Sequence, residues 1–312
     1  MFSVIFPGQG SQLVGMGKNL YDKYDFVKEL FVQADEILGY SISKIILEGP
    51  KDNLDLTENT QPAIFLVSCS IYEAIKRETN ITLEKAKYFA GHSLGEYSAL
   101  SASGSLDFNS AIKLLQARGR AMQTAVPKGQ GGMLAVLGTD IKKITEILDN
   151  NKNKYECFVA NDNSNSQVVL SGNINDLELL IEDLNNNSIK NIKLPVSAPF
   201  HCKLMRPATE IMKIKISQTN FDNPKNLIIS NVTARETKDS NEIKDLLIKQ
   251  IESPVKWRES VIYMVQNGVK KFVEIGPGKV LSGLIKRIDR SLEIVSVNDI
   301  EDIEKINLND WF

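Results

Sequence analysis

The sequence predicts an α/β protein with a mostly parallel sheet and a smaller α+β subdomain inserted into it. Three observations support this prediction. Short apolar strands alternate with amphipathic helices over residues 1 to 127, the texture changes at the glycine-rich segment PKGQGG (127–132), and six shorter elements follow that segment. We therefore expect a large domain formed by residues 1–127 and 197–312, and a small subdomain formed by residues 128–196.

The large domain begins with the apolar strand MFSVIF (1–6). A helix containing SIYEAIKRE (70–78) is expected next, with Pro62 in its first turn, where proline is tolerated. KYFAGHS (87–93) then predicts a strand that leads into a sharp turn. After Pro199 the domain resumes with the strands LIISNVT and KKFVEIG, a helix around IKDLLIKQI, and the turn and helix GPGKVLSGLIKRI. The acidic end, IEDIEKINLNDWF, is expected to be peripheral.

The small subdomain has a recognisable order of elements. MLAVLG, YECFVAN, QVVLSG and IKNIKLPVS predict strands, and IKKITEILDNN and NDLELLIEDLNNN predict helices. The polar stretch DNSNS (162–166) is expected to be the loop between the second and third strands. The order β-α-β-β-α-β is that of a ferredoxin-like fold.

Composition excludes several classes of function. The net charge of −2 gives no basic field for binding nucleic acid. No apolar run approaches the ~20 residues that span a bilayer, and the N-terminal run is too short for a signal peptide. Cys69, Cys157 and Cys202 fit neither a disulfide framework nor a zinc site. We therefore expect a protein of the reducing cytoplasm.

Glycines follow the first strand in PGQGSQLVGMG (7–17), which invites a nucleotide-binding interpretation. The dinucleotide motif needs a third glycine where Leu13 stands, and the phosphate-loop motif needs Gly-Lys-Ser or Gly-Lys-Thr. Neither pattern is present. The segment is either a tight turn for packing or a loop that stabilises a negative group of another kind.

The pentapeptide GHSLG (91–95) follows a strand and precedes the helical run EYSALSA. In that context Gly-x-Ser-x-Gly predicts a nucleophile elbow, which exposes the Ser93 hydroxyl at the end of the sheet. The alternative is that Ser93 merely caps a helix. An oxyanion formed by its attack would need two N–H donors, which we assign to Leu94, after the nucleophile, and Gln9, in the loop after the first strand.

A serine nucleophile needs a base, and the chain has only two histidines, His92 and His201. His92 adjoins Ser93 and is expected to pack behind the elbow, because neighbouring side chains diverge there. His201 is therefore the predicted base, although a structural role in the loop PFHC is the alternative. Cys202 as a nucleophile is disfavoured, because consecutive side chains rarely converge.

The helix FNSAIKLLQARGRAMQ, beginning near Asp107, places Arg118 on its apolar face with Ile112, Leu115 and Met122. Arg120 lies on the opposite, polar face. A buried arginine needs a partner, which is either a structural Asp or Glu or a carboxylate of the substrate.

Six segments occur in an order that identifies a family. FPGQGSQ, GHSLGEYSAL, ARGRAMQ, FHCKLM, QIESPVKW and VEIGPGKVLSGL resemble the malonyl-CoA:acyl-carrier-protein transacylases, which load malonyl units for fatty acid synthesis. The resemblance covers residues 2 to about 290. It implies an α/β-hydrolase-like core with a ferredoxin-like insert.

The resemblance also implies roles for single residues. Ser93 becomes the nucleophile and His201 the base, with Gln9 and Leu94 as oxyanion donors and Arg118 as the ligand of the malonyl carboxylate. The main-chain carbonyl of Gln250 would orient His201 in place of a triad aspartate. Met122 and Phe200 are expected to contact the substrate, and Phe200 matches the malonyl-type pattern.

The implied reaction is a ping-pong transfer from malonyl-CoA to the phosphopantetheine thiol of acyl carrier protein through a malonyl-serine ester. It needs no metal and no tightly bound cofactor. Two rivals remain, an esterase or thioesterase that would not need Arg118, and a non-catalytic scaffold that docks carrier proteins. Intact Ser93 and His201 argue against the scaffold.

Overall fold

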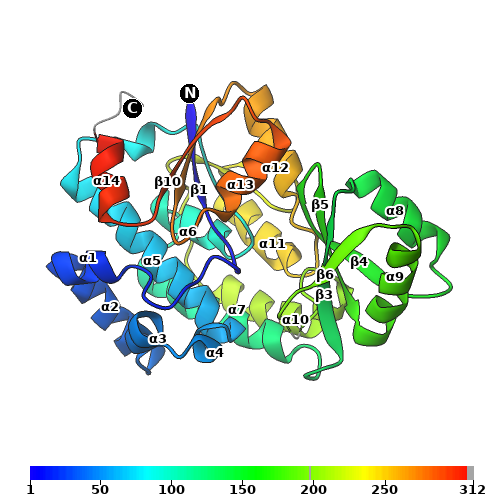
Figure 1. Cartoon of the computed structure of the whole chain (residues 1–312). Helices are drawn as coiled ribbons and strands as arrows, with labels where there is room; N and C mark the ends of the chain where they lie inside the picture. Colours follow the sequence, from blue (N-terminus) through cyan, green and yellow to red (C-terminus); the bar gives the residue numbers. More distant parts are fainter. Residues whose placement is uncertain (197, 308–312) are drawn as a thin grey trace.

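The computed structural model describes residues 1–196 and 198–307, in which two β-sheets organise the chain (Figure 1). The larger sheet has six strands in the order β10-β9-β1-β2-β7-β8. They are β1 (Phe2–Phe6), β2 (Tyr88–Gly91), β7 (Leu227–Ile229), β8 (Glu236–Thr237), β9 (Lys271–Ile275) and β10 (Glu293–Val297). All neighbours in this sheet are parallel except β7 and β8. The predicted α/β class with a mostly parallel sheet is confirmed.

Helices cover both faces of the large sheet. Those before the small subdomain are α1 (Lys18–Lys23), α2 (Asp25–Leu38), α3 (Ile42–Glu48), α4 (Lys51–Leu54), α5 (Thr57–Glu78), α6 (Gly95–Ala102) and α7 (Phe108–Thr124). Those after it are α10 (Arg206–Gln218), α11 (Ser240–Gln250), α12 (Trp257–Gln266), α13 (Val280–Ile288) and α14 (Ile300–Asn307). Short 3₁₀ turns occur at Leu83–Lys85 and Lys203–Met205.

The side chains of β1 show why the sheet is buried on both sides. Val4 and Phe6 join the apolar cluster that includes α5, α6 and α7, whereas Ile5 joins the cluster formed with α12 and α13. Successive side chains of a strand point to opposite faces. All five residues of FSVIF are buried and all but Ser3 are apolar, which is what a parallel strand covered on both faces requires.

Pro62 does not lie in the first turn of its helix, as the sequence predicted. Helix α5 begins at Thr57, so Pro62 stands in the helix interior. Proline there removes one main-chain hydrogen bond, which tertiary packing has to offset. Residues 59–68 of α5 are all buried, and this burial extends the helix through a position that local propensity would interrupt.

The small subdomain contains the second sheet, of order β4-β5-β3-β6, with every pairing antiparallel. Its elements are β3 (Gly131–Leu137), α8 (Ile141–Asn150), β4 (Cys157–Ser164), β5 (Gln167–Asn173), α9 (Ile174–Asn186) and β6 (Lys190–Lys193). In Figure 1 both helices lie on the outer side of this sheet, at the right of the molecule. The β-α-β-β-α-β order is therefore confirmed.

The loop predicted at 162–166 is shorter than expected, because β4 continues through Asp162 to Ser164. These polar residues fit a strand because the large domain supplies their partners. Arg258 of α12 pairs with Asp162 at 2.8 Å, and the main chains of residues 160 to 162 hydrogen-bond that of Val255. The two sheets are thus joined along β4.

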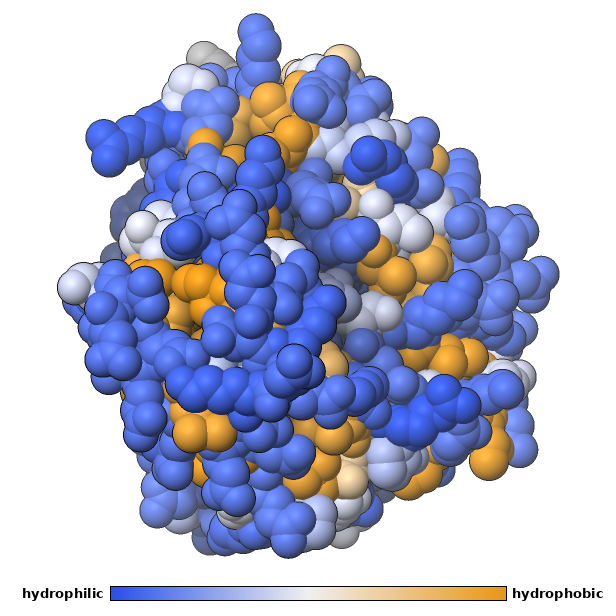
Figure 2. Space-filling view, turned by 90° about the vertical axis from the view of Figure 1, so that its right-hand side faces the viewer, coloured by the Kyte–Doolittle hydropathy of each residue, from blue (hydrophilic) through white to orange (hydrophobic). Residues whose placement is uncertain are grey.

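The side of the molecule that carries α8 and α9 faces the viewer in Figure 2 and is mostly hydrophilic, with hydrophobic residues in separate small groups. The apolar sides of these helices face inward, where Ile144, Leu177, Leu180 and Leu184 are buried against the strands. The amphipathic patterns that predicted the two helices are thus used to form a separate small core.

The domain limits at 127/128 and 196/197 stay predictions. β3 and β6 lie inside the proposed range, and residue 197, on which the second limit falls, lies outside the described residues. At the C-terminus α14 packs on the large domain through buried Ile303 and Ile306, so residues 300–306 are less peripheral than expected. The remainder of the predicted acidic tail, residues 308–312, lies outside the described residues.

No helix within residues 1–196 and 198–307 is long and apolar enough to cross a membrane. The same part of the chain contains no group of three His, Cys, Asp or Glu side chains that could hold a metal ion.

Candidate active site

Ser93 lies on the turn between β2 and α6, with a φ of 53°. A residue with a side chain adopts this left-handed conformation at a cost, and such strain gathers at functional sites. Gly91 and Gly95 make the turn possible, because a Cβ on Gly91 would lie 1.9 Å from Gly95 and a Cβ on Gly95 would lie 2.3 Å from the Phe6 oxygen. The local geometry is that of the predicted elbow.

His201 lies beside this serine although 108 residues separate them in the sequence. Its Nε2 atom is 2.9 Å from Ser93 Oγ, and its Nδ1 atom is 2.9 Å from the main-chain oxygen of Gln250. A carbonyl oxygen only accepts, so Nδ1 carries the proton and Nε2 is free to accept one from Ser93. His201 also has a φ of 60°, which marks a second strained position.

The surroundings of His201 keep its ring neutral. Burial and the nearby Arg118 guanidinium lower the pKa of His201 to about 3. The ring is therefore uncharged at neutral pH, the form in which it can accept a proton.

His92 is not simply packed behind the elbow, as the sequence analysis expected. Its Nε2 atom lies 2.8 Å from Asn163 Oδ1 of the small subdomain, its ring is 5.8 Å from that of Trp257, and it lines the cavity at Ser93. The extension of β4 brings Asn163 within reach. His92 therefore joins the two sheets at the edge of the site.

Cys202 offers no rival nucleophile. Burial raises the pKa of its thiol, and its Sγ donates to the Pro199 oxygen at 3.1 Å. A protonated, hydrogen-bonded thiol is a poor nucleophile.

Gln9 and Leu94 both line the cavity that contains Ser93. Gln9 lies in the loop after β1 and Leu94 in the turn after β2, so they follow two adjacent strands of the sheet. Among the described residues neither amide donates to another protein group. Both N–H groups are available to a ligand.

Arg118 is 1% exposed and has no acidic partner within the described residues. Nη1 donates to Gln61 Oε1 at 2.8 Å, and Nη2 donates to Gln250 Oε1 at 2.8 Å and to Ser93 Oγ at 3.1 Å. Nε is buried without a hydrogen-bond partner in the same set of residues. The sequence left two partners open for Arg118, a structural Asp or Glu and a substrate carboxylate. No Asp or Glu forms a salt bridge with it within the described residues.

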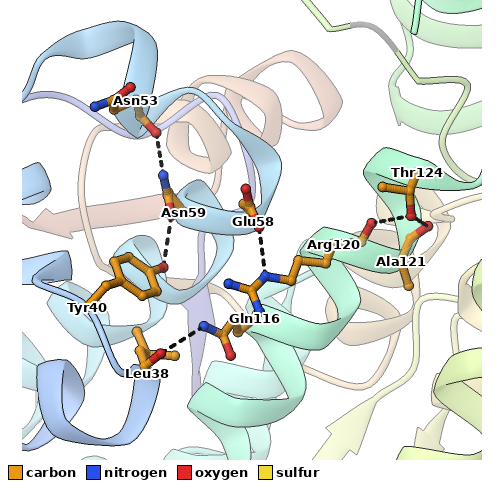
Figure 3. A network of polar contacts seen from close by, with 9 residues as sticks. All are labelled: Leu38, Tyr40, Asn53, Glu58, Asn59, Gln116, Arg120, Ala121 and Thr124. Carbon is orange, nitrogen blue, oxygen red and sulfur yellow. Dashed lines mark hydrogen bonds and ion pairs between the residues drawn. The ribbon is translucent and has the colours of Figure 1, made fainter. Parts of the chain in front are cut away.

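Arg120, two residues later, has the opposite surroundings. Figure 3 shows its side chain directed toward Glu58 of α5, with which it forms an ion pair of 2.7 Å. Its side chain is 57% exposed. Helical periodicity predicted Arg118 on the apolar face and Arg120 on the polar face. The buried Arg118 and the exposed Arg120 confirm that prediction.

A cavity of about 510 Å³ connects these groups. Met122 and Phe200, both predicted to contact the substrate, lie in its wall and are 1% and 6% exposed. Other lining residues come from the small subdomain, including Met133, Asn161 and Val169. The cavity thus lies between the two sheets, with Ser93 and His201 facing it.

Sequence reasoning from single residues missed Gln61, Glu96 and Asn231. Gln61 holds Arg118, and Asn231 Oδ1 accepts from the Ser93 amide at 2.7 Å. Glu96 could have been found from the sequence, because it is the one charged residue of the run SLGEYSAL. In the structure it is only 2% exposed.

Comparison with known proteins agrees with this geometry. The acyl transferase domain family model matches residues 3–306. The malonyl CoA-acyl carrier protein transacylase of Bacillus subtilis (strain 168) is 43% identical over 304 residues, which cover 96% of this chain and 94% of that protein. The transacylase of the same name from Escherichia coli (strain K12) is 37% identical over 299 residues, which cover 96% of each chain.

Solved structures give the same result. The acyl-carrier-protein S-malonyltransferase of Bartonella henselae has a TM-score of 0.94 and 40% identity, and the match covers 98% of each chain. A malonyl-transacylase solved in complex with a type II polyketide acyl carrier protein has a TM-score of 0.93 and 35% identity over 97% of this chain and 98% of that one. By fold, site geometry and sequence, the chain belongs to the acyl transferase family, with malonyl CoA-acyl carrier protein transacylases among its relatives.

Proposed function

We propose that this protein transfers a malonyl group from malonyl-CoA to the phosphopantetheine thiol of acyl carrier protein, through an ester on Ser93. One observation carries the proposal. Ser93 Oγ lies 2.9 Å from a neutral histidine and 3.1 Å from a buried arginine that has no ion pair among the described residues. The proposed nucleophile, Ser93 Oγ, therefore contacts both the proposed base and the proposed receptor for the acyl carboxylate.

In the first half-reaction Ser93 Oγ attacks the thioester carbonyl carbon, and its proton passes to His201 Nε2. The Gln250 carbonyl at Nδ1 orients the ring and stabilises the imidazolium that forms. Collapse of the tetrahedral intermediate breaks the carbon–sulfur bond. The proton on His201 then goes to the departing thiolate of coenzyme A, and malonyl-Ser93 remains.

The Gln9 and Leu94 amides serve as the oxyanion hole. A tetrahedral intermediate places negative charge on the former carbonyl oxygen, and prealigned N–H donors stabilise that charge without reorganisation. Both residues line the cavity, and neither amide donates to another group in the part of the chain that the structure describes.

Arg118 selects the acyl group. Its guanidinium is buried and has no ion pair within residues 1–196 and 198–307, which is costly unless a ligand supplies an anion. The free carboxylate of a malonyl group satisfies that need through a bidentate contact. An acetyl group does not, so the arginine favours malonyl. Met122 and Phe200 form the apolar wall beside the acyl chain.

In the second half-reaction the phosphopantetheine thiol attacks malonyl-Ser93, with His201 taking the thiol proton and returning it to Ser93. These steps involve no redox change, so they require no tightly bound cofactor, and malonyl-CoA enters as a substrate. The three cysteines are free thiols, which supports assignment to the reducing cytoplasm.

A labelling experiment tests the function. The protein is mixed with labelled malonyl-CoA, with and without holo acyl carrier protein. The proposed transferase becomes labelled alone and passes the label to the carrier. Release of free malonate at the same rate without the carrier would identify a thioesterase, and an unlabelled protein would identify a scaffold.

A further inference from the structure

The carboxylate of Glu96 is buried beside the site, yet the mechanism described above does not use it. Glu96 is the second residue of α6 and is 2% exposed. Its Oε2 atom accepts from Gln250 Nε2 at 2.7 Å and from the Asn231 main-chain amide at 3.1 Å. No salt bridge within the described residues includes it, so its hydrogen bonds are to neutral groups.

The contact with Gln250 decides how that side chain is oriented. Glu96 Oε2 is an acceptor in both of its hydrogen bonds, so it faces the amide nitrogen of Gln250 and not its oxygen. Gln250 Oε1 is then directed to the opposite side, where it accepts from Arg118 Nη2 at 2.8 Å. A flipped amide would place oxygen against carboxylate and nitrogen against guanidinium, two repulsive contacts in place of two attractive ones.

Gln250 also connects Glu96 to the other groups of the site. Its Nε2 atom donates to the main-chain oxygen of Ser93 at 3.2 Å, and its own main-chain oxygen accepts from His201 Nδ1. The order of the contacts is Glu96, Gln250, Arg118, with Ser93 Oγ next to the guanidinium. Arg118 and Glu96 are thus linked through one amide, whose oxygen faces the guanidinium and whose nitrogen faces the acid.

We propose that Glu96 is a positioning residue for acyl selection, because its carboxylate fixes the Gln250 amide and thereby holds the Arg118 guanidinium beside Ser93. The inference rests on the proposed function, since acyl selection has meaning only if the protein transfers acyl groups. The charge of Arg118 also opposes the effect of burial, which raises the pKa of Glu96 to about 7.

Two substitutions test this role. Glu96→Leu removes the acceptor, so the Gln250 amide loses the contact that sets its orientation. The ratio of kcat/KM for malonyl-CoA to that for acetyl-CoA should fall roughly 10- to 100-fold, the size expected for a hydrogen bond to a charged group. Glu96→Gln keeps an acceptor oxygen at nearly the same place and should return the ratio to within a few-fold of the wild-type value.

Glu274 provides a matched control. It is also a buried glutamate, but its carboxylate accepts from the Leu281 and Ser282 amides at the start of α13, and it is not among the residues that line the cavity at Ser93. Glu274→Gln should lower the unfolding midpoint without changing the malonyl-to-acetyl ratio. A ratio that shifts equally in the Glu274 and Glu96 variants would mean that loss of stability alone alters selection.

If Glu96→Leu does not fold, Glu96→Asp decides the question, because it keeps the acid but withdraws it from Gln250 by one methylene group. A malonyl-to-acetyl ratio that is unchanged in folded Glu96→Leu or Glu96→Asp, or malonyl and acetyl activities that fall in parallel there, would overturn the inference. Intact-mass analysis of the wild type with malonyl-CoA separates this failure from failure of the function. A malonylated wild type with unchanged ratios in the variants would contradict only the role of Glu96.

Discussion

Two polar networks lie on opposite faces of α7, and they use similar residues in different ways. The inner network consists of Ser93, Glu96, Arg118, His201 and Gln250, and the outer network consists of the residues drawn in Figure 3, around Arg120 and Glu58. Each contains an arginine held by hydrogen bonds. The outer arginine is exposed and paired with an acid, whereas the inner one is buried and bonded to amides and a hydroxyl.

The difference is the basis for proposing that Arg118 binds a ligand and that Arg120 is structural. An exposed ion pair contributes about 0–1 kcal/mol to stability and needs nothing further. A buried cation without an anion is retained against a large desolvation cost. Arg118 has no ion pair among the described residues, and under the proposed function the malonyl carboxylate supplies the anion.

The largest expected effect is that of Ser93→Ala. Incubation of the wild type with malonyl-CoA alone should add one malonyl group to the protein, at Ser93, and the variant should show none by intact-mass analysis. A variant that still carries the adduct would place the nucleophile outside the inner network.

The next effect distinguishes the two histidines. His201→Ala should lower the transfer rate by roughly 10²–10⁴-fold, the usual contribution of a general base. His92→Ala should act mainly on stability, because His92 bonds to Asn163 across the two sheets. Transfer kinetics and urea denaturation are measured on both variants. A folded His92→Ala protein without activity, next to an active His201→Ala protein, would reverse the assignment.

A third prediction concerns pH and stability. Burial raises the pKa of Glu96 from 4.5 to about 7, so its favourable contribution is complete below pH 4.5 and is lost as pH rises through 7. The pKa of His201 falls from 6.5 to about 3, so its contribution is complete above pH 6.5 and is lost as pH falls through 3.

The two groups therefore oppose each other between pH 4.5 and 6.5. The free energy of unfolding of Glu96→Gln minus that of the wild type should rise with pH, by up to about 1.4 kcal/mol per pH unit. The same difference for His201→Gln should fall with pH. Urea denaturation at pH 5, 6 and 7 measures both slopes, and slopes of the same sign would contradict the opposed shifts.

The smallest effect is expected in the outer network. Arg120→Ala removes an exposed ion pair with Glu58, so the free energy of unfolding should fall by no more than about 1 kcal/mol and transfer activity should hardly change. Chemical denaturation and the malonyl transfer assay measure the two quantities. A substantial loss of malonyl transfer would mean that the outer network also contributes to binding.

Features of the fold and the site could be predicted from the sequence where the interacting residues are close together along the chain. The elbow at Ser93 was predictable because glycines, strand and helix are adjacent in the sequence, and Arg118 was predictable because helical periodicity fixes its face. The His92–Asn163 contact was not, because its two residues are 71 positions apart and belong to different sheets. Pro62 and residues 162–164 were assigned wrongly for the same reason, since tertiary contacts extended α5 and β4 past local signals that predicted an end.

The role of Gln250 came only from the family resemblance. A neutral residue at the end of an amphipathic helix carries no pattern that predicts its main-chain contact with His201. The connection of Glu96 to Arg118 through Gln250 likewise required the structure, because it joins three separate helices.

The most direct test of the central claim compares acyl selection in Arg118→Ala, Arg118→Lys and Arg120→Ala. The measured quantity is kcat/KM for malonyl-CoA and for acetyl-CoA. In Arg118→Ala malonyl transfer should collapse while acetyl transfer holds or rises, because both the attraction and the unpaired buried charge are removed. Arg118→Lys should recover only part of the preference, since it lacks the planar fork, and Arg120→Ala should resemble the wild type. A parallel fall of malonyl and acetyl transfer in Arg118→Ala would contradict the claim and make Arg118 a structural residue.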